Sequence, residues 1–305
     1  MPDDRDAILG TLETERVNPA TAALDRMSPL EIVHAMNAAD ATVAGAVGHE
    51  LPRIARAVED IAARLRQGGR LIYIGAGSSG RMGVLDAVEC PPTFNTPPDQ
   101  VIGCMAGGAD TFARAVEGLE DDAGTGRADV ARLDVGARDA LVGIAASGRT
   151  PYVLGAVACA RERGALTIGL TCNAGTPLAE GVDITIAPLT GPEVVAGSTR
   201  LKAGTAQKMV LNMLSTGTMV LLGKTYGNLM VDVRASNEKL RRRAARIVAE
   251  ATGLDEGTAA ALLRAADDEP RTAIVAALAG VTPAAARERL AARGGSVRAA
   301  LDQGL

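Results

Sequence analysis

The chain has 305 residues, a formal net charge of −4 and a sequence pI of about 5.4, a balance that argues against nucleic acid as a partner. Hydrophobic residues make up 47% of it, yet it has no Trp and only two Phe, so its core must be aliphatic and rich in alanine. Its acidic N-terminus lacks the apolar core of a signal peptide, and no apolar stretch approaches the roughly 20 residues of a membrane helix. We expect a soluble, cytoplasmic protein without a membrane partner.

Helical periodicity begins after an irregular arm over residues 1–27. The segment 28–31, Ser-Pro-Leu-Glu, has the pattern of a helix start, with Ser at the N-cap and Pro at the first helical position. A second helix is expected over about 43–67. We therefore predict an N-terminal part, residues 1–68, made of an arm and helices that pack on the domain that follows.

Short apolar runs then alternate with helical segments. The expected strands are Leu71–Gly75, Val101–Ala106, Ala140–Ala146, Leu166–Cys172 and Ile184–Ala187. Helical stretches between them cover about 79–89, 110–120 and 151–163. Short buried strands separated by helices are typical of a parallel sheet with helices on both faces and right-handed crossovers. The predicted fold class is therefore α/β, with an open parallel sheet.

Only helices are predicted after the sheet. A long helix is expected over about 202–222, and another over 236–252 that ends at Gly253. From 255 onward the chain is rich in Ala, Leu and Arg and predicts a small module of three helices. Its helical pieces are broken at Glu269-Pro270, Thr282-Pro283 and Gly294-Gly295.

The cysteines and histidines show no metal or redox pattern. The four cysteines, at 90, 104, 159 and 172, have no C-x-x-C spacing, so we expect reduced, packed thiols. His34 and His49 lie in the N-terminal helical part, away from every predicted strand end. No G-x-S-x-G motif marks a nucleophilic serine. We expect a site without metal or cofactor that works with carboxylates, hydroxyls and lysine.

The first predicted strand runs into a glycine-rich turn, Gly75-Ala-Gly-Ser-Ser-Gly-Arg81, in front of a helix. Unpaired N–H groups and the helix dipole make such a turn an anion site. It also reads as the dinucleotide motif G-x-G-x-x-G, but the next strand lacks the ribose-binding acid at its end, and Asp110 comes too late. The adjacent hydroxyls of Ser78 and Ser79 favour one phosphate group. A mononucleotide stays open, and a sugar phosphate fits better.

A second hydroxyl-rich turn, Ser147-Gly-Arg-Thr-Pro151, follows the strand over 140–146. Thr150 occupies the position of an N-cap and Pro151 the first position of a helix. Ligands of open parallel sheets bind at the carboxyl ends of the strands, where both turns lie. Together the two turns predict a sugar-phosphate clamp.

Two glutamates are candidate acid–base groups. Glu89 precedes Pro91 and Pro92, which are expected to stop the helix that begins at the glycine-rich turn. Glu120 is expected to close the helix over 110–120, where neighbouring acids prevent composition alone from singling it out.

Six segments occur in an order that resembles the N-acetylmuramic acid 6-phosphate etherase family, from about Thr14 to the C-terminus. They are Gly75–Arg81, Glu89–Thr93, Ala115–Asp121, Ile144–Tyr152, Gly197–Lys208 and Asn228–Val233. The resemblance implies a flavodoxin-like sugar isomerase (SIS) domain, residues 69–235, and a small C-terminal helical domain, residues 236–305. It further implies a homodimer with its site near the subunit interface, and cytoplasmic recycling of cell-wall sugars.

By this resemblance the enzyme cleaves the lactyl ether of N-acetylmuramic acid 6-phosphate, giving N-acetylglucosamine 6-phosphate and D-lactate. Glu89 matches the family's catalytic proton donor and Glu120 its second active-site glutamate. Four hydroxyl residues match its phosphate-holding positions: Ser78, Ser79, Ser147 and Thr150. An aldose–ketose isomerase and a non-catalytic sugar-phosphate sensor, both on the same fold, are the alternatives.

Seven further residues are candidates for substrate contact, with a surface or structural role as the alternative. They are Gly77, Gly148, Glu193, Arg200, Lys202, Glu238 and Lys239. Ser79 and Glu89 present a geometric problem, because ten residues of unbroken helix separate them by about 15 Å, more than the length of a hexose phosphate. Either the helix breaks near Gly83, or Glu89 acts on a substrate held by the partner subunit. We favour the second explanation.

Overall fold

The computed structural model describes residues 12–114, 116, 118–233 and 238–302. A sheet of five parallel strands has the order β2-β1-β3-β4-β5. Its strands are β1 (Leu71–Gly75), β2 (Val101–Met105), β3 (Ala140–Ile144), β4 (Leu166–Leu170) and β5 (Ile184–Ile186). Every predicted strand is present, and the α/β fold class is confirmed.

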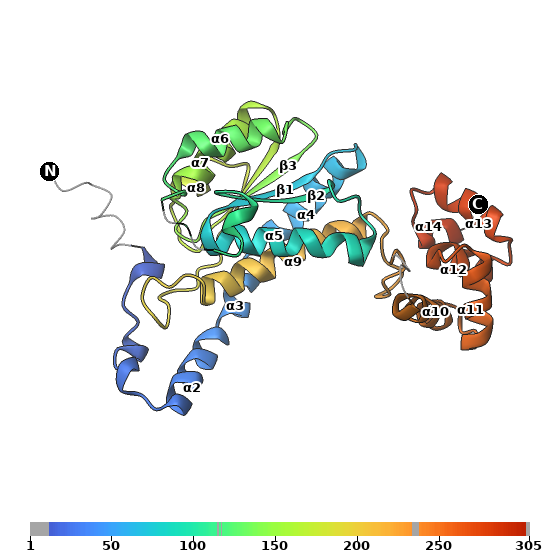
Figure 1. The fold of residues 1–305 in the computed structure, drawn as a ribbon, viewed down its shortest axis with the longest axis horizontal. Helices are drawn as coiled ribbons and strands as arrows, with labels where there is room; N and C mark the ends of the chain where they lie inside the picture. Colours follow the sequence, from blue (N-terminus) through green and yellow to red (C-terminus); the bar gives the residue numbers. More distant parts are fainter. Residues whose placement is uncertain (1–11, 115, 117, 234–237, 303–305) are drawn as a thin grey trace. The chain divides into compact units, whose positions relative to one another are not determined.

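Helices cover both faces of this sheet (Figure 1). They are α4 (Leu51–Arg66), α5 (Gly77–Phe94), α6 (Ala123–Arg132), α7 (Pro151–Glu162), α8 (Pro177–Glu180) and α9 (Lys202–Leu221). Alternate residues of β1 point to opposite faces. Ile72 joins the core cluster that contains Tyr152 of α7, whereas the side chain of Tyr73 lies against Gly83 of α5.

The N-terminal part contains α2 (Pro29–Asp40) and α3 (Val43–Gly48) before α4. The predicted start of the first helix is confirmed, since Ser28 and Glu31 form a capping box and Pro29 follows at the first helical position. The single helix predicted over 43–67 is wrong, because α3 and α4 are separate. Pro52 lies in the first turn of α4, where its missing N–H costs no helical bond.

The predicted end of α5 at its two prolines is also wrong. The helix continues through Pro91 and Pro92 to Phe94. The ring of proline fixes φ at a value that a helix also has. Pro91 and Pro92 lie among the last four residues of α5, so little of the helix follows them. The N–H of Asn95 donates to the carbonyl of Pro91 at 2.9 Å and completes the last turn.

No helix occupies the described part of 110–120, so the prediction there is wrong. A short 3-10 turn, η4 (Ala109–Thr111), is followed by turns and bends, and α6 starts only at Ala123. The carboxylate of Asp122 accepts the N–H of Gly124 and caps that helix. Residues 115 and 117 lie outside the described part of the chain.

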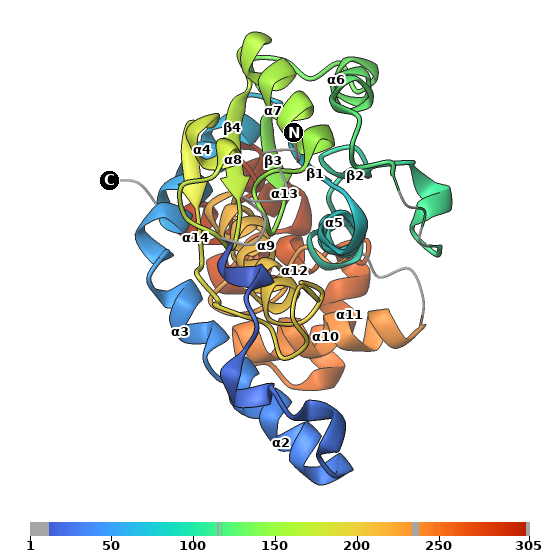
Figure 2. The same cartoon turned by 90° about the vertical axis from the view of Figure 1, so that its left-hand side faces the viewer.

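The chain divides into two compact units, one of residues 1–88 and 99–215 and the other of 89–98 and 216–305. The helices of the second unit are α10 (Glu238–Thr252), α11 (Glu256–Ala265), α12 (Pro270–Ala279), α13 (Pro283–Ala292) and α14 (Val297–Leu301) (Figure 2). In the described residues after 255 there are four helices rather than three, because the hydroxyl of Ser296 caps one more, α14. Residues 236 and 237, the expected start of α10, are outside the described residues.

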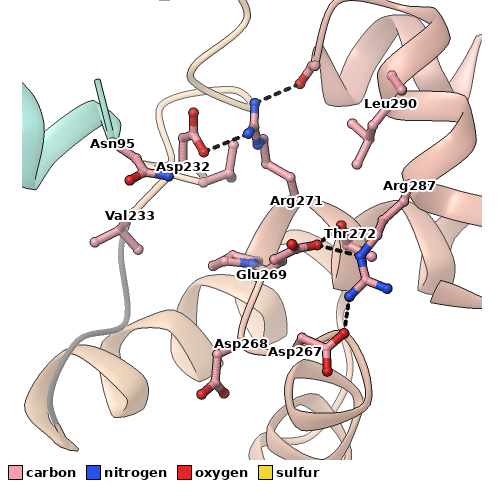
Figure 3. A pocket seen from close by; sticks show the side chains of 14 residues that line it. Asn95, Asp232, Val233, Asp267, Asp268, Glu269, Arg271, Thr272, Arg287 and Leu290 are labelled. Carbon is pink, nitrogen blue, oxygen red and sulfur yellow. Dashed lines mark hydrogen bonds and ion pairs between the residues drawn. The ribbon is translucent and has the colours of Figure 1, made fainter. Parts of the chain in front are cut away.

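An ion-pair network organises the second unit. The carboxylate of Asp232 is buried and pairs with Lys224 at 2.6 Å and with Arg271 at 2.8 Å. Arg271 and Arg287 line a pocket of about 500 Å³ in this unit. Figure 3 shows each of them directed at a carboxylate of the same unit. Asp232 belongs to the segment Asn228–Val233 that carries the family resemblance, and its contacts here are structural.

All four cysteines are buried, in agreement with the packed thiols that we expected. Among the described helices, none combines the length and the apolar character that a membrane crossing needs.

Candidate functional site

The two hydroxyl-rich turns begin side by side at the carboxyl edge of the sheet. Gly75, the last residue of β1, is paired with Ile144, the last residue of β3. The carbonyl of Gly75 also accepts the N–H of Ala106 at the end of β2. The segments that follow β1, β2 and β3 therefore all begin at the same edge of the sheet, on neighbouring strands.

The glycine-rich turn is tight because its glycines touch one another. A Cβ on Gly75 would lie 2.8 Å from the nitrogen of Gly80, and a Cβ on Gly80 would lie 2.7 Å from the oxygen of Gly75. Gly77 has a φ of 53°, a left-handed conformation that glycine adopts easily. Ser78 and Ser79 are partly exposed in the first turn of α5, where backbone N–H groups lack helical partners.

The second turn is shaped in a similar way. The hydroxyl of Ser147 accepts the N–H of Arg149 at 3.3 Å, and Gly148 has a φ of 65°. A Cβ on Gly148 would lie 2.3 Å from the hydroxyl oxygen of Thr176. Thr150 is the N-cap of α7, as predicted, yet among the described residues its side chain makes no capping hydrogen bond. The partly exposed Thr150 hydroxyl is thus not committed to the helix.

Two residues that the sequence did not single out, Asn173 and Thr14, support the second turn through hydrogen bonds. The amide of Asn173 donates to the carbonyl of Ala146 at 2.9 Å and to the hydroxyl of Thr14 at 3.0 Å. Both side chains are buried. The only sequence signal was that the family resemblance begins at about Thr14. The N-terminal arm therefore supports the strand end that carries Ser147.

Glu120 is exposed, and it lies in a turn just before α6. Its backbone carbonyl accepts the N–H of Tyr152 at 3.0 Å, in the first turn of α7. The phenol of Tyr152 donates to Asp129 of α6 at 2.7 Å, and burial together with this bond raises the pKa of Tyr152. Glu120 is thereby fixed next to the turn that holds Thr150.

Glu89 is exposed on α5, ten positions after Ser79. The helix is continuous between them, with Gly83 buried against Tyr73, so the explanation that α5 breaks near Gly83 is wrong. Ser79 belongs to the first compact unit of the chain and Glu89 to the second.

Two of the other candidates make structural contacts. Glu193 is fully buried, and its carboxylate accepts the N–H groups of Lys202 at 2.9 Å and Ala203 at 3.0 Å, at the start of α9. The ammonium of Lys202 donates to the carbonyl of Thr190 at 2.6 Å. Burial, and secondly the charge of Glu193, raise the pKa of Cys172 to about 12.

The remaining candidates are exposed. Arg200 lies in the turn before α9, while Glu238 and Lys239 start α10 in the second unit. Glu238 pairs with Arg242 at 3.1 Å. Among the described residues, no group of three or more His, Cys, Asp or Glu side chains is arranged to hold a metal ion.

Comparison with known proteins assigns the chain to a family. Two family profiles match it, the glucokinase regulatory protein N-terminal SIS domain over residues 53–161 and the SIS domain over residues 124–249. An N-acetylmuramic acid 6-phosphate etherase of Rubrobacter xylanophilus is 58% identical over 299 residues, 98% of this chain and 99% of the relative. The chain belongs to the N-acetylmuramic acid 6-phosphate etherase family. An etherase of the same name from Streptomyces coelicolor is 55% identical, over 96% of this chain and 94% of its own.

A solved structure has the same fold as part of this chain. Phosphoheptose isomerase from Francisella tularensis superimposes with a TM-score of 0.50 at 19% identity, over 64% of this chain and 100% of that chain. Together with the SIS profile, it confirms the SIS-type sheet that the resemblance implied.

Proposed function

We propose that this protein is a carbon–oxygen lyase that cleaves the D-lactyl ether of N-acetylmuramic acid 6-phosphate, in cytoplasmic recycling of cell-wall sugars. The observation that carries the proposal is the 58% identity to an etherase of that name across 98% of the chain. The paired turns at the ends of β1 and β3 support it, because they provide two helix N-termini for one phosphate group.

The substrate phosphate is bound by the hydroxyls of Ser78, Ser79, Ser147 and Thr150, with the backbone of Gly77 and Gly148 alongside. Two of these hydroxyls lie in the first turn of α5, and Thr150 is the N-cap of α7. Both helix dipoles present their positive ends to a dianion held there. Binding at this remote group places the reacting carbons of the sugar.

The reaction is an elimination followed by addition of water. Opening of the sugar ring gives an aldehyde that acidifies the C2 proton, which a carboxylate removes. The C3–O bond breaks, the C2–C3 double bond forms, and lactate leaves with a proton from an acid. Water then adds its hydroxyl to C3 and a proton to C2. Glu89, the proton donor, and Glu120 supply the acid and the base, each within hydrogen-bond reach of its proton in the substrate complex.

The active form is a homodimer in which the site is shared. None of the residues of α2, all of them described, is buried, and Leu30 and Val33 are 65% and 56% exposed. A helix of 12 residues is only marginally stable without a packing surface, which a second copy would supply. Because α5 does not break between Ser79 and Glu89, we favour an arrangement in which Glu89 acts on substrate bound to the partner subunit.

The test is incubation of the purified protein with N-acetylmuramic acid 6-phosphate and assay of D-lactate. We expect D-lactate and N-acetylglucosamine 6-phosphate in equal amounts. An isomerase would release no lactate. A sensor would bind the sugar phosphate, measured by calorimetry, without any turnover.

A further inference from the structure

The guanidinium of Arg81 is directed at backbone carbonyls of another segment. Arg81 lies on α5, two residues after Ser79, and is partly exposed. Its Nη2 donates to the carbonyls of Thr111 at 2.8 Å and Arg114 at 3.1 Å, and its Nε donates to that of Phe112 at 2.9 Å. One side chain thus binds three carbonyls within four residues. The planar fork of arginine suits this task, whereas lysine offers a single point charge.

The segment that Arg81 holds is itself folded back on the end of β2. The hydroxyl of Thr111 shares its single proton between the carbonyls of Ala106 at 2.8 Å and Gly108 at 2.7 Å. Gly107 has a φ of 81°, and a Cβ there would lie 2.4 Å from Leu119. Leu119, the residue before Glu120, also packs against the core cluster that contains Ile72 and Tyr152. The loop after β2 and the residue next to Glu120 therefore fit together closely.

Glu120 is held from the other side by α7. Besides the bond from the Tyr152 N–H to the Glu120 carbonyl, helices α6 and α7 approach through glycine. A Cβ on Gly126 would lie 2.0 Å from the oxygen of Tyr152, and a Cβ on Gly155 would lie 2.1 Å from the oxygen of Ala123. These contacts fix the position of Glu120 relative to the second turn. Arg81, which lies next to the first turn, binds the loop that precedes Glu120.

We propose that Arg81 is a positioning residue. By binding the carbonyls of residues 111, 112 and 114 it fixes the loop that leads to Glu120, and so the place of Glu120 relative to Ser78 and Ser79. Substrate held at the glycine-rich turn then meets the Glu120 carboxylate at a set distance. The proposal rests on the proposed function, because it takes Glu120 as an active-site group. Among the described residues, no carboxylate forms an ion pair with Arg81, so its charge is used on these carbonyls.

The test compares Arg81→Gln and Arg81→Lys with the wild type, using Arg163→Gln as the matched control. Arg163 also donates from Nε to a carbonyl, that of Val135 at 2.6 Å, but ahead of β3, at the opposite edge of the sheet. For Arg81→Gln we expect kcat to fall about tenfold or more and KM to change less than about threefold, because the phosphate contacts remain. Arg81→Lys should recover part of the loss, and Arg163→Gln should keep the wild-type kcat.

A double mutant separates positioning from general damage. If Arg81 acts through Glu120, adding Arg81→Gln to Glu120→Gln lowers kcat no further than Glu120→Gln alone. An additive loss would overturn the proposal, and so would a raised KM with unchanged kcat, which would mean that Arg81 binds the phosphate itself. If Arg81→Gln does not fold, the same comparison is made with Arg81→Lys.

Amide hydrogen exchange over residues 106–114 provides a readout that needs no activity. Exchange should be faster in Arg81→Gln than in the wild type or Arg163→Gln. Unchanged exchange would contradict the proposal for Arg81, whereas a wild type that releases no lactate would contradict only the proposed function.

Discussion

Gly75 and Ile144 are register partners at the ends of the adjacent strands β1 and β3, so the two hydroxyl-rich turns start from one point of the sheet edge. Neither turn alone specifies a sugar phosphate. Their adjacency does favour one, because two helix N-termini and hydroxyls from both turns can surround a single phosphate group.

Replacement of Glu89 by Gln should remove most of the activity without affecting the fold. The side chain is exposed, so the free energy of unfolding should not change, whereas loss of the proton donor that we propose should lower kcat about 100-fold or more. D-Lactate release and thermal unfolding measure the two effects. Glu59→Gln, at an exposed position on α4, is the control and should keep full activity. Normal turnover by Glu89→Gln would remove this residue from the mechanism.

Mixed dimers test whether the site is shared between subunits. Chains with Glu89→Gln and chains with Ser79→Ala should each be impaired alone. After unfolding together and refolding, half of the dimers are mixed, and each mixed dimer has one site with both residues intact. We expect about a quarter of the wild-type activity. No recovery above the two parents would argue that Ser79 and Glu89 of the same chain work together.

Gly148→Ala should distort the second turn. The new Cβ would lie 2.3 Å from the Thr176 hydroxyl, at a φ of 65°. We expect the free energy of unfolding to fall by about 1–3 kcal/mol and KM to rise. Gly175→Ala is the matched control, because its φ of 59° is similar but no described atom lies within 4 Å of the added Cβ. Equal losses in both variants would mean that backbone conformation, and not the clash, sets the cost.

Asp139 should contribute stability that disappears in acid. Arg70 donates to it through its guanidinium at 2.7 Å and through its backbone N–H at 2.9 Å. Burial by itself would raise the pKa of Asp139, but the bonds from Arg70 and from the Gly136 N–H outweigh it and hold the pKa below its usual range. A depressed native pKa stabilises the fold above the unfolded value of about 3.9 and loses this effect as pH falls through the native value.

Urea unfolding of wild type and Asp139→Asn at several pH values checks this. Asp139→Asn should be less stable at neutral pH, and the difference should shrink below about pH 4. Asp60→Asn is the control, since its surface pair with Arg56 is long, at 3.7 Å. A difference that stays constant into acid would contradict the role assigned to Asp139.

The sheet and both turns were predictable because their signals are local. Each strand is a short apolar run. The tight turn after β1 requires glycine at positions 75 and 80, and both glycines are visible in the sequence. The predicted helix bounds were wrong where individual capping or proline residues, and not hydrophobic periodicity, determine where a helix starts or ends. Asp122 caps α6 and moves the helix expected over 110–120 to a later start, and Pro91 and Pro92 fit inside α5 close to its end.

Contacts between distant residues could not be predicted. The bonds from Arg81 reach 30 to 33 residues along the chain, and the bond from Tyr152 to Glu120 joins a helix start to a turn that was expected to be helical. Neither contact has a spacing or composition that marks it. The support of Ala146 by Asn173 and Thr14 likewise depends on how the N-terminal arm folds back.

The central claim is that this protein breaks the lactyl ether by elimination at C2–C3 and then adds water. Turnover of N-acetylmuramic acid 6-phosphate in deuterated, ¹⁸O-labelled water tests it most directly, with both products analysed by mass spectrometry and NMR. We predict D-lactate without ¹⁸O, and N-acetylglucosamine 6-phosphate with deuterium at C2 and ¹⁸O at C3. Release of ¹⁸O-labelled lactate, or of a sugar without deuterium at C2, would contradict it.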